Sequence, residues 1–319
     1  MSEIKLIYCD SAEWNSWNNK LTYEQGFLLG AIVIFENNLI QGQVIIYANP
    51  HHQINNSKTI SLGNINLPDD DYTFSEVHNL SIVAATKLEA KYIISPMDGS
   101  TWNNYRFASF QPQSPFFLET TNEEYPLQQF KKLGYKVYAN YISSISNKIF
   151  HYWEKNKSKY DSFIEMGMEF HNFNLDQAEE EFRDLATFCN SAFRKNLFFS
   201  PISEDEFVEK MMKVIPILNP AYTIIARMNE KIAGFIFAYQ DINSKDTKNI
   251  IVKTLARDID QPYGGLGSVL SSLSMRAVEK DGFENCIHAL MYDNNISTNI
   301  SSNFHGKILS KYELLFYTI

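Results

Sequence analysis

The stretch Tyr263-Gly264-Gly265-Leu266-Gly267-Ser268 carries most of what this sequence says about its fold. It opens an apolar stripe with the three-and-four spacing of one helical face, formed by Leu266, Val269, Leu270, Leu273, Ala277 and Val278. Upstream, residues 250–256 are rich in β-branched side chains and predict a strand. A strand, a glycine loop and a helix in this order are typical of an anion site, because the free amides of the first helical turn point into the loop.

Two other interpretations of the glycine loop remain. The loop is a tight strand-to-helix turn that binds nothing, or it belongs to a dinucleotide-binding fold. The loop comes late in its domain, and its glycine spacing fails the dinucleotide fingerprint. The anion preference of helix N-termini therefore favours a phosphate ligand.

Composition narrows the class of protein. The chain has 319 residues, of which 45% are hydrophobic, enough for two domains with real cores. A net charge of −9 argues against nucleic-acid and anionic-membrane partners. Cys9, Cys189 and Cys286 are few and far apart, which fits reduced thiols, and no signal peptide or apolar span of ~20 residues is visible. The seven histidines, even His51-His52, lack metal-ligand spacing. We therefore expect a soluble cytoplasmic protein without a metal.

An internal repeat organises the chain. Residues 36–47 align with residues 228–239, and each segment has an Asn-containing turn between two strand-like runs. One constant offset pairs Asn37 with Asn229, Ile40 with Ile232, Gly42 with Gly234 and Tyr47 with Tyr239. In both halves a helix-like stretch (74–90; 266–280), a short strand (91–95; 285–289) and a last β-run (to 141; 308–317) follow in the same order. The sequence predicts an α/β protein made of two similar units.

The boundary between the units is expected in a charged, turn-poor region. We predict one domain at residues 1–150, a linker at 151–171 and a second domain at 172–319. Asn172-Phe173-Asn174 is suited to cap a helix with Leu175, Ala178, Phe182, Leu185 and Cys189 on one face. A capping box, Ser203 with Glu206, predicts a second helix.

This order of elements resembles the GNAT acyltransferase superfamily over roughly residues 170–319, and Gly265-Leu266-Gly267 matches the end of that family's pyrophosphate-loop motif. The whole chain resembles tandem GNAT proteins whose first half has lost the loop. The runs that carry this second resemblance are 95–102, 105–106, 115–119, 198–203 and 288–291. The resemblance implies two tandem GNAT-like domains, each a mixed, mostly antiparallel sheet flanked by helices.

Two departures from the family pattern concern the loop. Where the family has Arg or Gln, three residues before Gly265, this chain has Pro262, which has no N–H to donate. The remaining phosphate donors are the backbone amides of Tyr263, Gly264, Gly265, Leu266, Gly267 and Ser268. In the first half, residues 67–72 have three carboxylates and no glycine, so we expect no CoA site there.

The resemblance implies acyl transfer from acyl-CoA, with acetyl-CoA expected, to the amine of a small molecule or peptide. The cofactor's pantetheine would pair with the backbone near Leu255 and Ala256, and its thioester would lie where that strand splays from strand 285–290. Asn295 fits the family's Asn beyond the fifth strand. The family's Tyr donor to the thiolate is Ser302 here, so Tyr292 and Tyr312 are candidate substitutes.

Further site candidates each have a plainer alternative. His288 is a candidate base or a core histidine. Trp102, Tyr105 and Arg106 line an acceptor pocket between the halves or form a packing cluster. Glu119 meets the acceptor amine or is a solvated strand end.

The predicted function is N-acyltransferase. The alternative is a catalytically inactive acyl-CoA-binding or regulatory protein, which Pro262 and Ser302 favour. The acidic composition leans towards a cationic acceptor, but amino acids, polyamines, antibiotics, peptide N-termini and lysine all stay open.

Overall fold

The computed structural model describes residues 3–121, 124–147, 149, 151–244, 248–293 and 306–319. The first half contains the strands β1 (Glu3–Tyr8), β2 (Leu28–Glu36), β3 (Leu39–Tyr47), β4 (Gln53–Ile54), β5 (Ser57–Asn66), β6 (Tyr92–Ser95), β7 (Phe107–Phe110) and β8 (Lys136–Ser146). Its helices are α1 (Trp14–Trp17), the 3-10 turn η1 (Asn18–Lys20), α2 (Asp71–Lys87) and α3 (Glu124–Lys132).

The second half repeats this plan. Its strands are β9 (Met168–Asn172), β10 (Ile224–Met228), β11 (Lys231–Gln240), β12 (Asn249–Arg257), β13 (Asn285–Tyr292) and β14 (Lys307–Thr318). Its helices are α4 (Trp153–Glu165), α5 (Ala178–Ala192), α6 (Glu204–Met212) and α7 (Leu266–Lys280), with 3-10 turns η2 (Leu175–Gln177) and η3 (Ile215–Ile217). The helix predicted after the glycine loop is therefore confirmed as α7.

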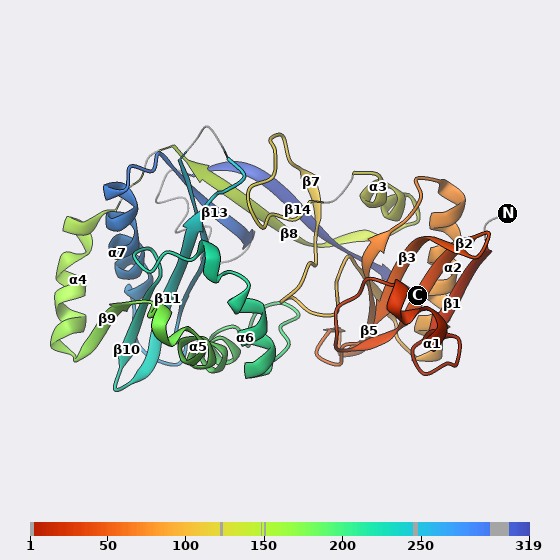
Figure 1. The fold of residues 1–319 in the computed structure, drawn as a ribbon, viewed down its shortest axis with the longest axis horizontal. Helices are drawn as coiled ribbons and strands as arrows, with labels where there is room; N and C mark the ends of the chain where they lie inside the picture. Colours follow the sequence, from red (N-terminus) through yellow and green to blue (C-terminus); the bar gives the residue numbers. More distant parts are fainter. Residues whose placement is uncertain (1–2, 122–123, 148, 150, 245–247, 294–305) are drawn as a thin grey trace.

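The strands form one continuous sheet in the order β1-β2-β3-β5-β6-β14-β8-β13-β12-β11-β10-β9. The described pairs are antiparallel except β5–β6 and β12–β13, which confirms the predicted mixed, mostly antiparallel sheet. The last strand of each half is exchanged: β14 pairs with β6, whereas β8 pairs with β13. Figure 1 shows β8 and β14 crossing the middle of the molecule between two lobes. The predicted boundary near residue 150 thus separates two repeats but not two sheets.

The internal repeat is visible in the strand register. The β2–β3 hairpin shifts register between the pairs Ile34–Gly42 and Phe35–Ile40, and the β10–β11 hairpin shifts at the matching place. A Cβ on Gly42 would lie 2.8 Å from a backbone oxygen of β5. A Cβ on Gly234 would lie 2.8 Å from a backbone oxygen of β12. Close strand approach therefore explains why both halves have glycine here.

Residues 151–171, predicted to be a linker, form α4 and β9 instead. β9 pairs antiparallel with β10, and Asn156 of α4 donates to the Ser272 hydroxyl of α7 at 2.8 Å. Phe163 is buried against Leu266 in the core under α7. The charges that suggested a linker occupy the exposed side of an amphipathic helix, which explains the difference.

Helices cover both faces of the second half's sheet. α4 and α7 pack on one face, where Leu266 and Val269 meet Ile236. α5 and α6 pack on the other, where Phe182 and Phe207 join a separate core. The two predicted caps are present: Ser203 accepts from the Glu206 amide at 3.2 Å, and Asn174 accepts from the Asp176 amide at 3.1 Å. Among the helices of the described ranges, none is long and apolar enough to cross a membrane.

Candidate functional site

A gap opens in the sheet between β12 and β13. The two strands pair in parallel only from Asn249–Asn285 to Val252–His288. Beyond this point β12 continues beside β11, whereas β13 follows β8. Among the described residues, the divergence leaves one backbone edge of residues 253–256 without a strand partner, where the family resemblance implied a splay.

A β-bulge stands at the start of the gap. Val252 pairs with Ala238 and Thr254 pairs with Phe237, so Lys253 is the extra residue on β12. The bulge resets the alternation of side chains, since Val252 and Leu255 both pack against the α7 core. Sequence reasoning missed Lys253, because a bulge inside an otherwise regular strand has no local signal here.

The glycine loop places free amides at the N-terminus of α7. Gly265 has φ +91° at the N-cap position and no side chain to cap the helix. The amides of Tyr263, Leu266 and Ser268 donate to carbonyls of the loop itself. Within the described part of the chain, the amides of Gly264, Gly265 and Gly267 donate no hydrogen bond. Three of the six predicted donors therefore remain for an anion.

Lys159 lies over this loop. A Cβ on Gly265 would be 3.0 Å from Lys159 Cδ and 3.2 Å from its Nζ. The lysine comes from α4, the segment that the sequence interpretation treated as a linker, and it brings a positive charge to the loop.

The remaining cofactor candidates lie along β12. Leu255 Cδ2 would be 3.7 Å from a Cβ on Gly267, so this side chain packs under the loop. Ala256 is buried in the core under α5. Asn295 and Ser302 lie outside the described residues.

Arg106 is buried at the junction of the two halves. Its guanidinium lies 3.8 Å from the ring centroid of Tyr105 and 4.3 Å from that of Tyr141. Its Nη1 donates to the carbonyl of Leu290 at 3.4 Å, which links it to β13 beside the gap. Burial lowers the pKa of Arg106 to about 10, so the group stays charged at neutral pH.

Glu119 and Tyr312 are joined at the same junction. The Tyr312 hydroxyl donates to one oxygen of Glu119, and the other oxygen accepts from the Phe116 amide at 3.0 Å. Glu119 is 9% exposed, so it is not the solvated strand end of the plainer alternative. Burial, followed by the hydrogen bond to Glu119, raises the pKa of Tyr312, which makes its phenol a weaker acid.

His288 pairs with Val252 in the last parallel pair before the gap. Its Nε2 is 3.6 Å from Cys286 Sγ, and Cys286 packs in the core under α7. Burial lowers the pKa of His288 to about 4, so the ring is neutral and weakly basic near pH 7. This environment matches the core histidine that the sequence left as the alternative.

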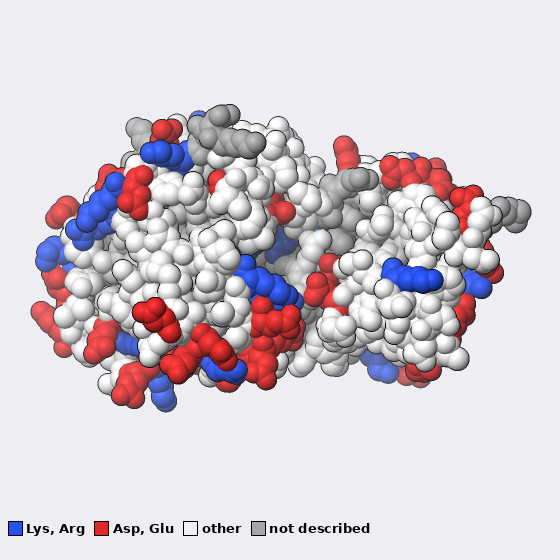
Figure 2. Space-filling model, in the orientation of Figure 1, with Lys and Arg blue, Asp and Glu red and all other residues white. Residues whose placement is uncertain are grey.

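Trp102 joins the halves through packing. Its indole Nε1 donates to the Ser200 carbonyl at 2.8 Å, and its ring contacts Phe193, Phe199 and Phe207. It also lines a crevice of about 100 Å³ between the halves. Tyr292 stacks at a tilt on Tyr141, with 5.4 Å between ring centroids. Figure 2 shows the two lobes separated by a notch with acidic and basic side chains at its edges.

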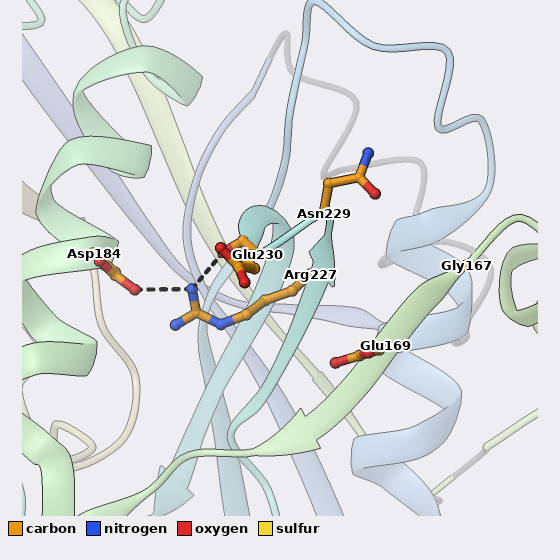
Figure 3. A pocket seen from close by; sticks show the side chains of 6 residues that line it. All are labelled: Gly167, Glu169, Asp184, Arg227, Asn229 and Glu230. Atoms are coloured by element: carbon orange, nitrogen blue, oxygen red, sulfur yellow. Dashed lines mark hydrogen bonds and ion pairs between the residues drawn. The ribbon is translucent and has the colours of Figure 1, made fainter.

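A larger hollow of about 480 Å³ lies at the β10–β11 turn. Figure 3 shows Arg227 there, and it donates to Asp184 at 2.8 Å and to the Glu230 carbonyl at 3.0 Å. Glu169, Asp184 and Glu230 give this hollow three carboxylates against one guanidinium that is already paired. It therefore does not suit a phosphate.

No family model and no curated protein matches the sequence. Solved structures do match in fold. A GCN5-related N-acetyltransferase from Anabaena variabilis matches with a TM-score of 0.54 and 9% identity, over 99% of this chain and 73% of that chain. A tandem GNAT protein from the clavulanic acid biosynthesis pathway matches with a TM-score of 0.50 and 8% identity, over 100% of this chain and 98% of that chain.

A third match is the GCN5-related glucosamine N-acetyltransferase region of a fungal multi-domain GH3 β-N-acetylglucosaminidase. Its TM-score is 0.52 at 13% identity, over 99% of this chain, and this chain spans 38% of that one. The protein therefore has the tandem GNAT fold, as the order of elements predicted. Identities this low establish the fold alone.

Proposed function

We propose that this protein is an acyl-CoA-dependent N-acyltransferase that uses acetyl-CoA and transfers the acyl group directly to an amine. One observation carries the proposal: the free amides of Gly264, Gly265 and Gly267 lie at the N-terminus of α7, directly after the strand that diverges from β13. A helix N-terminus binds phosphate well, and the edge of β12 that has no strand partner among the described residues lies next to the gap.

The residues present fit a CoA nucleotide. A Cβ on Gly264 would meet nothing within 4 Å, so a phosphate has room to approach the backbone. The three glycine amides and the Lys159 ammonium would hold the diphosphate, and the backbone of Leu255 and Ala256 would pair with the pantetheine. Bound acyl-CoA would supply the acyl group as a thioester.

Direct transfer requires positioning and one net proton movement. The amine nitrogen bonds to the carbonyl carbon while the carbon–sulfur bond breaks, and one proton passes from the amine to the sulfur. His288 is weakly basic, and the Tyr312 proton is held by Glu119. We therefore assign more of the rate to orientation in the gap than to either of these groups.

A second function has support from particular residues. Pro262 removes one phosphate donor, and Tyr312 is engaged with Glu119 rather than free to protonate a thiolate. Both features favour a protein that binds acyl-CoA without catalysis. In either case the predicted cytoplasmic location is part of the proposal, and it is supported by the three free cysteines.

Titration calorimetry with acetyl-CoA tests the shared premise. We expect saturable binding together with thermal stabilisation of the protein. No heat and no stabilisation would contradict both functions. We also expect slow CoA release in buffer and faster release with a panel of amines, whereas binding without amine-stimulated release would support the non-catalytic alternative.

A further inference from the structure

The gap between β12 and β13 contains a lysine whose position suggests what the acceptor looks like. Lys253 is the bulge residue of β12, so its side chain begins where the two strands separate. It is half-buried, and within the described residues its ammonium makes no hydrogen bond or ion pair. A partly desolvated ammonium without a partner is costly unless an anion reaches it.

The charges that act on Lys253 come from the other half of the chain. They are the Arg106 guanidinium, which disfavours the charged form of Lys253, and the Glu119 carboxylate, which favours it. Burial, with a contribution from Arg106, lowers the pKa of Lys253 to about 8, so most of the population remains cationic at neutral pH.

Glu119 cannot fully neutralise these two cations. It carries one negative charge against two positive ones, its oxygens accept from the Tyr312 hydroxyl and the Phe116 amide, and no ion pair joins it to Lys253 within the described residues. Hydrogen bonds of the neighbouring residue Phe117 to the second half also hold the Glu119 segment in place. The amide of the neighbouring Phe117 donates to Asp241 at 2.9 Å, and Tyr239 donates to the Phe117 carbonyl at 3.3 Å.

Arg106 is held equally firmly. Tyr105 and Tyr141 cover its faces, and Leu290 of β13 accepts its hydrogen bond. The junction therefore presents two cations, of which Arg106 is held in place, and one carboxylate beside the gap. This local excess of positive charge outweighs the acidic character of the whole chain, since charges at short range in a partly buried site are screened least.

We infer that the acceptor is an amine that also bears a carboxylate, in the manner of an amino acid, and that Lys253 binds this carboxylate beside Arg106. The inference rests on the proposed acyl transfer for the role of the amine. The carboxylate would bind at Lys253, between the halves, while the amine extends along the gap towards Leu255 and Ala256. Lys253 is thus a specificity residue contributed by the strand that would bind the cofactor.

Matched ligands test this inference on the full-length protein. Each amino acid is compared with its primary amide and with its decarboxylated amine, which differ only at the proposed contact. Binding is measured by calorimetry without any acyl-CoA, and kcat/KM is measured by CoA release with acetyl-CoA. We expect the carboxylate form of at least one set to be favoured by about tenfold or more in both measurements, as for a hydrogen-bonded charge pair.

Two variants test whether the preference for the carboxylate form depends on Lys253. Lys253→Met keeps the length of the side chain and removes its charge, so the preference should fall to about twofold or less, mainly through KM. Lys253→Arg keeps the charge and should keep part of the preference. Unchanged thermal stability and unchanged acetyl-CoA affinity in Lys253→Met would show that fold and cofactor site are intact.

The outcomes separate this inference from the proposed function. Carboxylate-selective binding that Lys253→Met abolishes supports the inference even if acetyl-CoA does not bind, because that second result concerns the acyl-transfer proposal alone. Equal binding of the three ligand forms, binding of none of them, or an unchanged preference in Lys253→Met overturns the inference. Acylation of Lys253 itself, detected by mass spectrometry after incubation with acetyl-CoA, also overturns it.

Discussion

The two halves have the same order of elements, but the N-termini of their corresponding helices, α2 and α7, are capped differently. In the first half Asp70 is the N-cap of α2, and its carboxylate accepts from the amide and the hydroxyl of Thr73, each at 2.7 Å. In the second half the N-cap is Gly265, which has no side chain to accept those bonds. The same helix end is filled by the protein's own anion in one half and open in the other.

The halves also differ in whether their parallel strand pair opens into a gap. β5 and β6 pair in parallel as β12 and β13 do, but the chain after β6 turns back onto β5. The Met97 amide donates to the Leu62 carbonyl at 2.8 Å, and Asp98 accepts from the Asn64 amide at 2.6 Å. In the first half, the protein's own groups therefore occupy both places that are open in the second: a carboxylate caps the helix, and the backbone and side chain of the following segment pair with the strand edge.

The largest effect should come from blocking the open helix end. The space around Gly264 is open to 4 Å from the position of a Cβ, so Gly264→Glu adds a carboxylate where phosphate belongs without distorting the loop. We expect acetyl-CoA affinity to fall by about a hundredfold or more, because like charges at close range cost several kcal/mol. Gly264→Ala is the control and should bind within about threefold of the wild type. Unaltered affinity of Gly264→Glu would show that the loop does not hold the cofactor.

Each half contains a buried histidine whose pKa burial lowers to about 4, His52 in the first half and His288 in the second. The unfolded chain takes up these protons first, near pH 6.5, so the stability present above that pH is lost as the pH falls towards 4. The free energy of unfolding of the wild type should fall between pH 8 and pH 5, and the His288→Gln variant should lose about 2 kcal/mol less over this range.

Urea unfolding of the wild type and His288→Gln at both pH values checks this expectation. Parallel stability curves for the wild type and His288→Gln would contradict the buried neutral state of His288.

The role of Asp70 at the N-terminus of α2 can be tested by removing its carboxylate. Asp70→Ala should lower the free energy of unfolding by about 1 kcal/mol through loss of the N-cap. It should not create a second CoA site, because Met97 and Asp98 still bridge the strands. The exposed neighbour supplies the control, Asp69→Ala. Binding of a second equivalent of acetyl-CoA to Asp70→Ala would show that the Asp70 cap alone prevents the first half from binding CoA.

The smallest effect is expected from removing the charge of Lys159, which lies over the glycine loop. Lys159→Ala should weaken acetyl-CoA binding by about fivefold at low salt and by less at high salt, since the lysine is exposed and screened. Lys155→Ala, on the same helix, should leave the affinity unchanged. An equal loss in both variants would assign the effect to the overall charge of α4.

The sequence by itself determined the repeated hairpins, the order of elements and the extent of α7. These features depend on turn chemistry and on periodicity within a few residues, as the matched turns and the glycine loop illustrate. The loop's chemistry was readable for the same reason, because glycine at a helix start has a local meaning.

Only the tertiary structure decided the exchange of β8 and β14, the incorporation of residues 151–171 into the second half, and the positions of Lys159 and Lys253. Strand partners far apart in the chain are selected by the edges that remain unpaired once each half has folded, and a bulge depends on the neighbouring strand. The charges that we assign to cofactor and acceptor thus reach the site through long-range pairing, for which a single sequence has no periodic signal.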